Sequence, residues 1–242
     1  MRLAVISDSH ANLHALDAVL DAIELEGVDA IWSLGDVVGY GPRPNECSRL
    51  VADRTTLALC GNHDLGVLGK IDVDFFSGDA ARAALWTREV LDDDARRYLE
   101  GLSPSASLDG VGLFHGSPRD PVWDYVLSAA AARDALELSA TALVLVGHSH
   151  VALALGLEGG RISGGVAPGG TEIDLGRGRW LLNPGSVGQP RDGDPRAAFL
   201  LLDLERRSAS FRRIDYSIEE TQEELRAAGL PEGLAARLPH GL

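Results

Sequence analysis

The N-terminal third of the chain alternates between short apolar runs and segments with helical periodicity. Apolar runs at residues 3–7, 30–36 and 57–60 have the length and composition of buried strands. Apolar side chains recur at helical spacing from residue 13 to 23, and a second helix is predicted near residues 44–52. Strands separated by helices are typical of βαβ units, so the sequence predicts parallel strands and an α/β fold.

The regular alternation of strands and helices ends in the middle of the chain. Residues 65–102 are predicted to be helical and charged, and further strands are predicted at 111–116 and 142–150. Residues 151–182 are rich in glycine, and turn signals separate their short apolar runs, which predicts antiparallel hairpins. Residues 197–217 alternate with a period of two, as a half-exposed hairpin would.

A charged helix is predicted over residues 218–229, close to the C-terminus. Neither an internal repeat nor a linker interrupts the chain. Because 45% of its residues are hydrophobic, the chain can bury a substantial core. We therefore expect a single domain over residues 1–242, with its core divided between two sheets.

Charge and composition exclude several classes of function. The formal net charge is −14, from 36 acidic and 22 basic residues, which disfavours non-specific binding to nucleic acids and membranes. Asp8 interrupts any apolar signal segment, and no apolar stretch reaches the roughly 20 residues of a membrane span. We expect a soluble cytoplasmic protein. Cys47 and Cys60 form no CxxC pair, so ordinary core thiols are expected.

Polar side chains of a particular kind follow five of the predicted strands. They are Asp8, His10, Asp36, Asn62, His63, Asp64, His115, His148 and His150. In open α/β sheets, ligands bind outside the carboxyl ends of the strands, so these side chains are expected to meet at one edge. One such motif is weak evidence, because a lone His115 is more often a hydrogen-bonded core residue. Five together favour a metal site.

The types of side chain indicate which metals would bind. Asp and His are ligands for first-row transition ions, whereas an all-oxygen set would indicate magnesium or calcium. Without His63 and Asp64, seven candidate ligands remain, too many for one tetrahedral site. If Asp36 bridges, each of two ions receives four protein ligands. Two ions about 3.5–4 Å apart are used in phosphoester hydrolysis, where they activate a bridging water and stabilise charge on the phosphoryl oxygens.

These motifs resemble the five blocks of the calcineurin-like metallophosphoesterases. The blocks in this sequence are DSH (8–10), GD (35–36), GNHD (61–64), HG (115–116) and GHSH (147–150), in matching order and approximate spacing across residues 1–190. The segment NPGSVG (183–188) resembles a loop of small bacterial and archaeal members. The resemblance implies a four-layer α/β/β/α sandwich with two mixed sheets and two metals at the sheet edge.

The resemblance also implies a role for each candidate. One ion would take Asp8, His10, Asp36 and His150, and the other would take Asp36, Asn62, His115 and His148. Manganese is the first expectation for both ions, with iron, zinc, nickel or cobalt as alternatives. His63 would stay off the metals and act at the leaving-group oxygen as general acid or transition-state stabiliser, since imidazole titrates near neutral pH. Asp64 could either orient His63 or close the turn.

One departure from the family pattern narrows the subgroup. Protein phosphatases and diadenosine-polyphosphatase relatives carry an acid and an arginine after the second block, where this chain has Gly39 and Tyr40. This departure favours the small phosphodiesterase and phosphatase branch.

The candidates for binding the substrate, which have less support in the sequence, are Asn12, Arg43, Arg119 and Arg191. Asn12 opens a helix, where backbone N–H groups suit an anion, although it could instead be an N-cap. The arginines lie in loops that follow the blocks, and each could equally be an ordinary surface charge. The helical segment 65–102 lies where a cap over the site would be, and we expect it to shape specificity.

The sequence therefore predicts a dinuclear metal-dependent phosphoesterase that hydrolyses phosphodiesters, nucleotide-type substrates included, with a metal-bridging hydroxide as nucleophile. Its partner would be a small phosphorylated substrate. Two alternatives stay open, namely a phosphomonoesterase acting on a small metabolite and a scaffold that keeps the fold without turnover. The oligomeric state is not predicted.

Overall fold

The computed structural model describes residues 1–242 and contains two six-stranded mixed sheets. The first sheet has the order β3-β2-β1-β11-β12-β9. Its strands are β1 (Arg2–Ile6), β2 (Ala30–Ser33), β3 (Leu57–Ala58), β9 (Glu172–Asp174), β11 (Ala197–Asp203) and β12 (Ser208–Ile214). The second sheet has the order β4-β5-β6-β10-β7-β8. Its strands are β4 (Ser105–Leu108), β5 (Val111–Phe114), β6 (Leu143–Val146), β7 (Leu153–Glu158), β8 (Arg161–Val166) and β10 (Arg179–Asn183).

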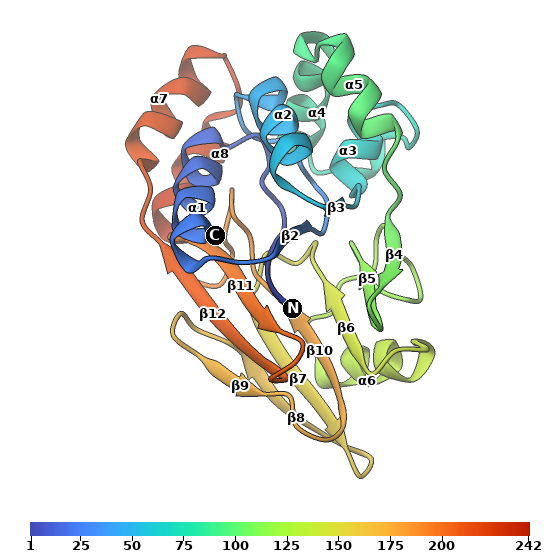
Figure 1. The fold of residues 1–242 in the computed structure, drawn as a ribbon. Helices are drawn as coiled ribbons and strands as arrows, with labels where there is room; N and C mark the ends of the chain where they lie inside the picture. The colour runs from blue at the N-terminus through green and yellow to red at the C-terminus, as the bar shows by residue number, and fades with distance from the viewer.

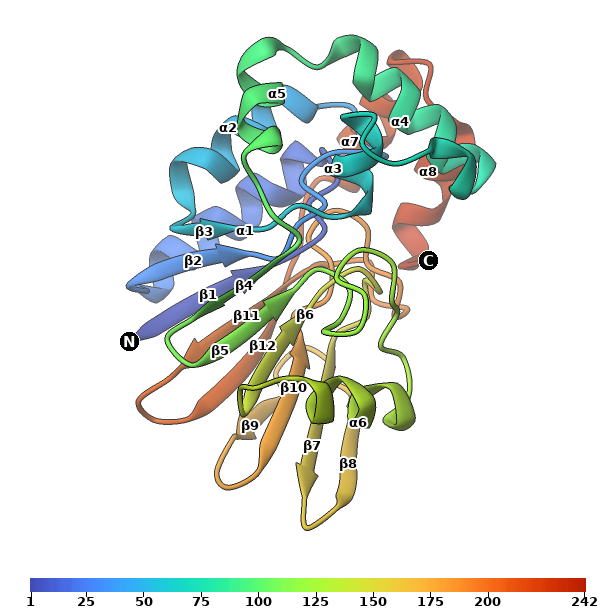
Figure 2. The same ribbon diagram turned by 90° about the vertical axis from the view of Figure 1, so that its right-hand side faces the viewer.

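Helices cover the outer face of each sheet, which gives the expected four-layer sandwich (Figure 1). The helices are α1 (Leu13–Glu26), α2 (Pro44–Arg54), α3 (Asn62–Val67), α4 (Gly78–Val90), α5 (Asp93–Glu100), α6 (Ala129–Leu138), α7 (Ile218–Ala227) and α8 (Glu232–Arg237), with short 3₁₀ turns η1 (Val73–Phe75) and η2 (Leu238–His240). Most of the helices gather over the first sheet, whereas α6 packs on the second (Figure 2). No helix has both the length and the apolar composition needed to cross a membrane.

The sequence of β1 shows why it lies at the centre. Leu3 and Val5 point into the core between the two sheets, and Ala4 and Ile6 point toward the helical layer. Successive side chains of a strand alternate between faces, so a strand buried on both faces needs a continuous apolar run. The run at residues 2–6 meets that requirement.

The half-exposed hairpin predicted at residues 197–217 is corrected by the structure. β11 and β12 do form an antiparallel hairpin, but six of the seven residues of β11 are buried. The reason is that β11 also pairs with β1, which places it inside the sheet with a layer on each face. Period-two alternation could not reveal this second pairing.

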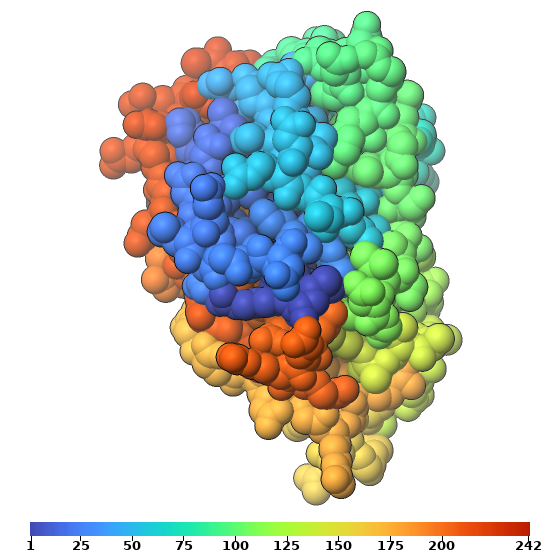
Figure 3. Space-filling model, viewed as in Figure 1, coloured from blue at the N-terminus to red at the C-terminus, as the bar shows by residue number.

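The glycine-rich region contains one hairpin and two strands with distant partners. β7 and β8 pair as a hairpin that projects at the lower end of the molecule (Figure 3). β10 pairs with β6 in parallel and with β7 in antiparallel orientation, and β9 joins the other sheet beside β12. Two elements were not predicted. They are β4, which turns into β5 through Asp109 and Gly110 with positive φ, and the short helix α8.

The helical segment 65–102 covers the site only in part. Ala95 and Leu99 of α5 pack into the core beneath the outer helices, and Asp92 at its start pairs with Arg49 of α2. The portion that approaches the sheet edge is the turn around Phe75 and Phe76 together with the first residues of α4.

Candidate metal centre

The loops that follow the parallel strands are tied together by backbone hydrogen bonds. β1, β2 and β3 are parallel neighbours in the first sheet, and β5, β6 and β10 in the second. The amide of His10 donates to the carbonyl of Asp36 at 2.9 Å, which joins the first two loops. The amide of His148 donates to Asp8 Oδ2 at 3.2 Å and connects the two sheets. The strand ends therefore meet at one edge, as predicted.

Five of the seven predicted ligands have a left-handed backbone. The φ angles are 55° at Asp8, 48° at His10, 51° at Asp36, 62° at His148 and 58° at His150. Such angles are uncommon for residues other than glycine and cost about 1–3 kcal/mol each, and they concentrate at functional sites. The strained backbone at these five residues marks this edge of the sheets as a candidate functional site.

Asp8, His10 and His150 form one buried cluster. Nε2 of His10 lies 3.0 Å from Nε2 of His150, and Nε2 of His150 lies 3.5 Å from Asp8 Oδ1. The Nδ1–H groups of His10 and His150 donate to the carbonyls of Val38 and Gln189. Because Nδ1 carries the proton in both rings, the two Nε2 lone pairs face each other, an arrangement that a cation between them would stabilise.

Asp36, Asn62, His115 and His148 form the second cluster. His115 Nε2 lies 3.3 Å from Asn62 Oδ1, 3.2 Å from His148 Nδ1 and 3.4 Å from Asp36 Oδ2. His115 donates through Nδ1 to the carbonyl of Leu34, so Nε2 is the nitrogen that faces the cluster. His148 is the exception, because it directs Nδ1 into the cluster, with its ring stacked on Tyr125 at 3.9 Å between centroids.

Asp36 stands between the two clusters. Its Oδ2 lies 3.6 Å from His10 Nε2 as well as 3.4 Å from His115 Nε2. Both Asp36 Oδ2 and Asp8 Oδ1 are buried without a hydrogen-bond partner. Ligand atoms about 2.0–2.2 Å from one ion lie roughly 3.0–3.6 Å from each other, and the pairs given above fall in this range, while His10 Nε2 and Asp8 Oδ1 are 3.9 Å apart. The donor set therefore fits divalent ions, and two triads, Asp8–His10–His150 and Asp36–His115–His148, could each hold one.

Burial governs the charge of these groups in the metal-free protein. It raises the pKa of Asp8 to about 7, and it lowers the pKa values of His10 and His150 well below the usual range. Burial also opposes charge on His115, but the Asp36 carboxylate beside it outweighs burial and raises the pKa of that imidazole to about 9. The neutral imidazoles of His10 and His150 keep free Nε2 lone pairs that suit a cation, whereas His115 would release its proton when an ion binds.

His63 lies next to the two clusters and belongs to neither. It is in the first turn of α3, and its ring stacks on Phe76 at 4.7 Å and contacts Tyr40 at 4.3 Å and His10 at 4.8 Å between centroids. Its backbone N–H donates to Asp36 Oδ1 at 2.8 Å. Burial lowers the pKa of His63 to about 4, so its imidazole is neutral and can donate one hydrogen bond.

Asp64 has a different role from orienting His63. Its two carboxylate oxygens accept hydrogen bonds from the backbone N–H groups of Val37, Val38 and Gly61, at 3.2, 3.0 and 2.9 Å. These bonds fasten the loop after β2 to the start of α3. The aromatic contacts of His63 with Tyr40 and Phe76 hold its ring instead.

Three of the four candidate substrate residues have other partners in the structure, which matches the alternatives left open for them, namely an N-cap and surface charges. Asn12 caps α1 through Ala15 N–H and bonds to Thr221 and Gly188, which uses both its amide oxygen and its nitrogen. Arg43 pairs with Glu46 and Glu224. Arg119 pairs bidentately with Asp124 on the surface. Carboxylates close to each arginine in space, rather than its position after a motif, determine where these side chains lie.

Arg191 does reach the site. It lines a cavity of about 260 Å³ together with Asn62 and His63, and it donates to the Tyr40 hydroxyl at 3.1 Å. Other residues of this cavity were not predicted. They are Tyr40, Phe75, Phe76, Ser77, Ala80, Trp123, Tyr125 and Arg237. Only Tyr40 gave a signal in the sequence, because it replaces the expected arginine.

The loop after β10 is hydrogen-bonded to the backbone of the segments that carry the candidate ligands. Ser186 Oγ donates to the carbonyl of Asp8 at 2.9 Å, and Asn183 Nδ2 donates to the carbonyl of Gly147 at 2.7 Å. These hydrogen bonds give the NPGSVG segment a structural role, because they hold the first motif (8–10) and the last motif (147–150) in fixed positions relative to each other.

We expect Gly61→Ala to damage the centre. A Cβ at Gly61 would lie 2.1 Å from Asp36 Oδ1 and 2.5 Å from His115 Cε1, so Asp36 or α3 must move. Overpacking of this kind typically costs about 1–3 kcal/mol. Thermal unfolding with and without Mn²⁺ should show a lower melting temperature and weaker stabilisation by the ion. Gly165→Ala, where the added carbon meets nothing within 4 Å, is the matched control, and equal melting curves would contradict the prediction.

Comparison with known proteins gives a consistent result. The family model of the calcineurin-like phosphoesterase superfamily domain matches residues 1–207. An uncharacterized protein of Methanocaldococcus jannaschii is 38% identical over 241 residues, covering 98% of this chain and 96% of that protein. The crystal structure of a metallophosphoesterase from Sphaerobacter thermophilus has a TM-score of 0.90 and 41% identity, covering 100% of this chain and 99% of its own. A hypothetical protein from Pyrococcus horikoshii, with a TM-score of 0.81, 21% identity and coverage of 100% and 98%, shares the fold.

Proposed function

This chain belongs to the calcineurin-like phosphoesterase superfamily, and from that premise we propose that it is a dinuclear metal-dependent hydrolase of phosphodiesters, nucleotide-type diesters included. The proposal rests mainly on the position of the Asp36 carboxylate between the two clusters. Its unpartnered Oδ2 faces a histidine nitrogen of each cluster, 3.6 Å from His10 and 3.4 Å from His115. A carboxylate oxygen in that position suits a ligand shared by two cations.

The proposed ligands divide into two sets that share Asp36. Asp8, His10 and His150 hold the first ion with it, and Asn62, His115 and His148 hold the second. When bound, such a pair of ions supplies an activated water and neutralises charge on the phosphoryl oxygens. Manganese is the first candidate for both ions, because the set mixes carboxylate, amide and imidazole donors.

The other residues of the cavity act on the substrate. His63 donates a hydrogen bond to the leaving-group oxygen and assists its departure, which its position beside both clusters supports. Arg191 binds a phosphate group of the substrate, as a planar guanidinium does well. Phe76 and Tyr40 enclose His63 on either side and limit the access of water to it.

Model substrates assayed side by side test the proposal. With Mn²⁺, we expect bis(p-nitrophenyl) phosphate to have a higher kcat/KM than p-nitrophenyl phosphate. Chelation should abolish both activities and added Mn²⁺ should restore them, because the bound ions supply the activated water that attacks the phosphate. A preference for the monoester would favour a phosphomonoesterase acting on a small metabolite. A protein that binds no Mn²⁺ and hydrolyses neither would favour a scaffold without turnover.

A further inference from the structure

Two arginines in the cavity beside the metal centre have no acidic partner. Arg191 and Arg237 both donate to Oε1 of Gln189, at 2.8 and 3.2 Å, and both guanidinium groups lie near the Tyr40 ring, 5.5 and 5.9 Å from its centroid. Neither forms an ion pair, although acidic residues outnumber basic ones by 36 to 22 in this chain. Arg43 and Arg119, the other two arginines that follow the motifs in the sequence, are each paired with carboxylates.

This arrangement is unfavourable without an anion. Burial and the neighbouring charge of Arg191 lower the pKa of Arg237, and Nε of Arg191 is buried without a hydrogen-bond partner. Two like charges that share one neutral amide acceptor repel each other, and a buried unpaired donor is costly. A bound phosphate would reduce the repulsion between the two arginines and would accept a hydrogen bond from the unpaired donor, because guanidinium groups match phosphate oxygens in charge and in geometry.

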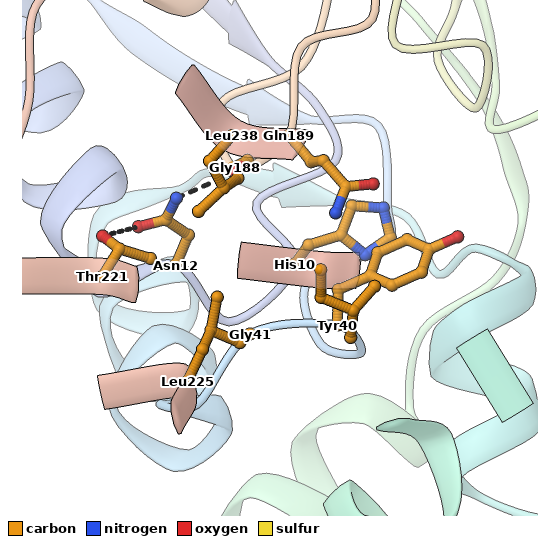
Figure 4. A pocket seen from close by; sticks show the side chains of 10 residues that line it. His10, Asn12, Tyr40, Gly41, Gly188, Gln189, Thr221, Leu225 and Leu238 are labelled. Carbon is orange, nitrogen blue, oxygen red and sulfur yellow. Dashed lines mark hydrogen bonds between the residues drawn. The ribbon is translucent and has the colours of Figure 1, made fainter. Parts of the chain in front are cut away.

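Packing fixes Arg237 in this position. It ends α8 in the C-terminal segment, which lies beyond residues 1–207 of the family match. Leu225, Leu234 and Leu238 of this segment pack in one cluster with Tyr40, and Thr221 bonds to Asn12. Figure 4 shows Thr221, Leu225 and Leu238 arranged beside His10, Tyr40 and Gln189. The segment thus delivers a second guanidinium to a site whose ligands come from the rest of the chain.

Aromatic side chains line the opposite part of the same cavity. Phe75 and Phe76 meet Trp123 edge to face, with centroids 6.2 and 5.6 Å apart, and Tyr125 lies beside them. Phe75 is 77% exposed, so its ring is free to contact a ligand in this cavity. Exposed aromatic faces next to cationic groups suit a nucleobase and its phosphates.

We propose that Arg191 and Arg237 form an anion subsite for a second, uncleaved phosphate of a nucleotide-type substrate, whose base contacts the Phe75–Trp123 side of the cavity. This assignment rests on the proposed function, because the scissile phosphate is taken to lie at the metal centre. The pair lies beside Tyr40, which stands where the family pattern has an arginine.

The first test uses the metal-free protein, so that its outcome does not depend on hydrolysis. Calorimetric titration with inorganic phosphate should show one site. We expect Arg237→Gln and Arg191→Gln each to weaken it about tenfold or more, the usual effect of losing a charged hydrogen bond. Arg237→Lys should recover part of the affinity. Arg226→Gln, in the same segment but paired with Glu232, is the control and should bind as the wild type does. No phosphate binding, or equal binding by all variants, would overturn the subsite.

The second test asks which phosphate the pair holds. Thymidine 5′-(p-nitrophenyl phosphate) and its 3′-phosphorylated form differ only in a second phosphate. In the Mn²⁺-loaded protein, Arg237→Gln should raise KM about tenfold for the 3′-phosphorylated substrate, with a smaller effect on the other. An equal rise for both substrates would place the pair on the scissile phosphate and contradict the proposal. Failure of the protein to hydrolyse either compound would count against the proposed function, whereas the calorimetric result would still decide the anion subsite.

Discussion

Asp36→Asn should lose metal binding and most activity. Asp36 is the only residue whose carboxylate oxygen faces both clusters, so its charge contributes to both ion sites. Removal of a residue that merely supports a ligand costs about 10–100-fold in affinity. We therefore expect the loss of this shared charge to weaken binding by more than about a hundredfold and to lower kcat/KM for bis(p-nitrophenyl) phosphate at least as much.

Metal analysis and thermal unfolding measure this effect without relying on turnover. The wild type should contain close to two ions per chain after loading with Mn²⁺. At a hundred times its Kd, a bound ion stabilises a protein by about 2.7 kcal/mol, or roughly 5–10 °C for a chain of this size. The Asn variant should show little of this shift. Asp53→Asn, on the exposed face of α2, should behave as the wild type. Retention of both ions by the Asp36 variant would refute the shared-ligand assignment.

His63→Ala should separate chemistry from metal binding. The ring lies against His10 and Tyr40 but outside both ligand clusters, so its removal should leave the metal content unchanged. A positioned acid or hydrogen-bond donor typically contributes about 10²–10⁴-fold. We expect a loss of that size for diesters with alkoxide leaving groups. The loss should be much smaller for p-nitrophenolate, which departs without a proton.

The comparison of leaving groups is the decisive measurement for His63. A His63→Gln variant keeps a hydrogen-bond donor and most of the volume, and should recover part of the activity. His240→Ala, at an exposed position, is the control for a histidine away from the site. Loss of metal from His63→Ala, or an equal loss of activity for both leaving groups, would show that His63 supports the ligands rather than the leaving group.

A candidate residue could be predicted from the sequence when its position depends on nearby residues. It could not be predicted when its position depends on residues far away in the chain. Asp8, His10, Asp36, His115, His148 and His150 each lie at or shortly after the end of a predicted strand. Parallel strands of one sheet end at the same edge, so proximity within each sheet follows from the strand pattern, whereas each cluster is completed only by the packing of the two sheets. The fold class was predictable for the same reason, because strand and helix signals are local.

The substrate side could not be predicted in this way. Asn12, Arg43 and Arg119 stand near the motifs in sequence, but Thr221, Glu224 and Asp124 engage them. A long polar side chain binds whichever partner the folded chain places within reach, and a position after a motif does not specify that partner. Asp64 is similar, since its backbone partners at 37 and 38 come from another loop.

The α/β sandwich and the positions of the candidate metal ligands thus follow from local patterns, namely apolar runs long enough to be buried strands, each with a candidate ligand at its end. The arginine pair does not. Arg237 reaches Tyr40 and Gln189 only because α7 and α8 pack back over the N-terminal half of the chain, and Phe75 and Trp123 meet only across two loops. Such contacts depend on long-range packing of apolar faces, which carries no signature in the sequence around any one of these residues.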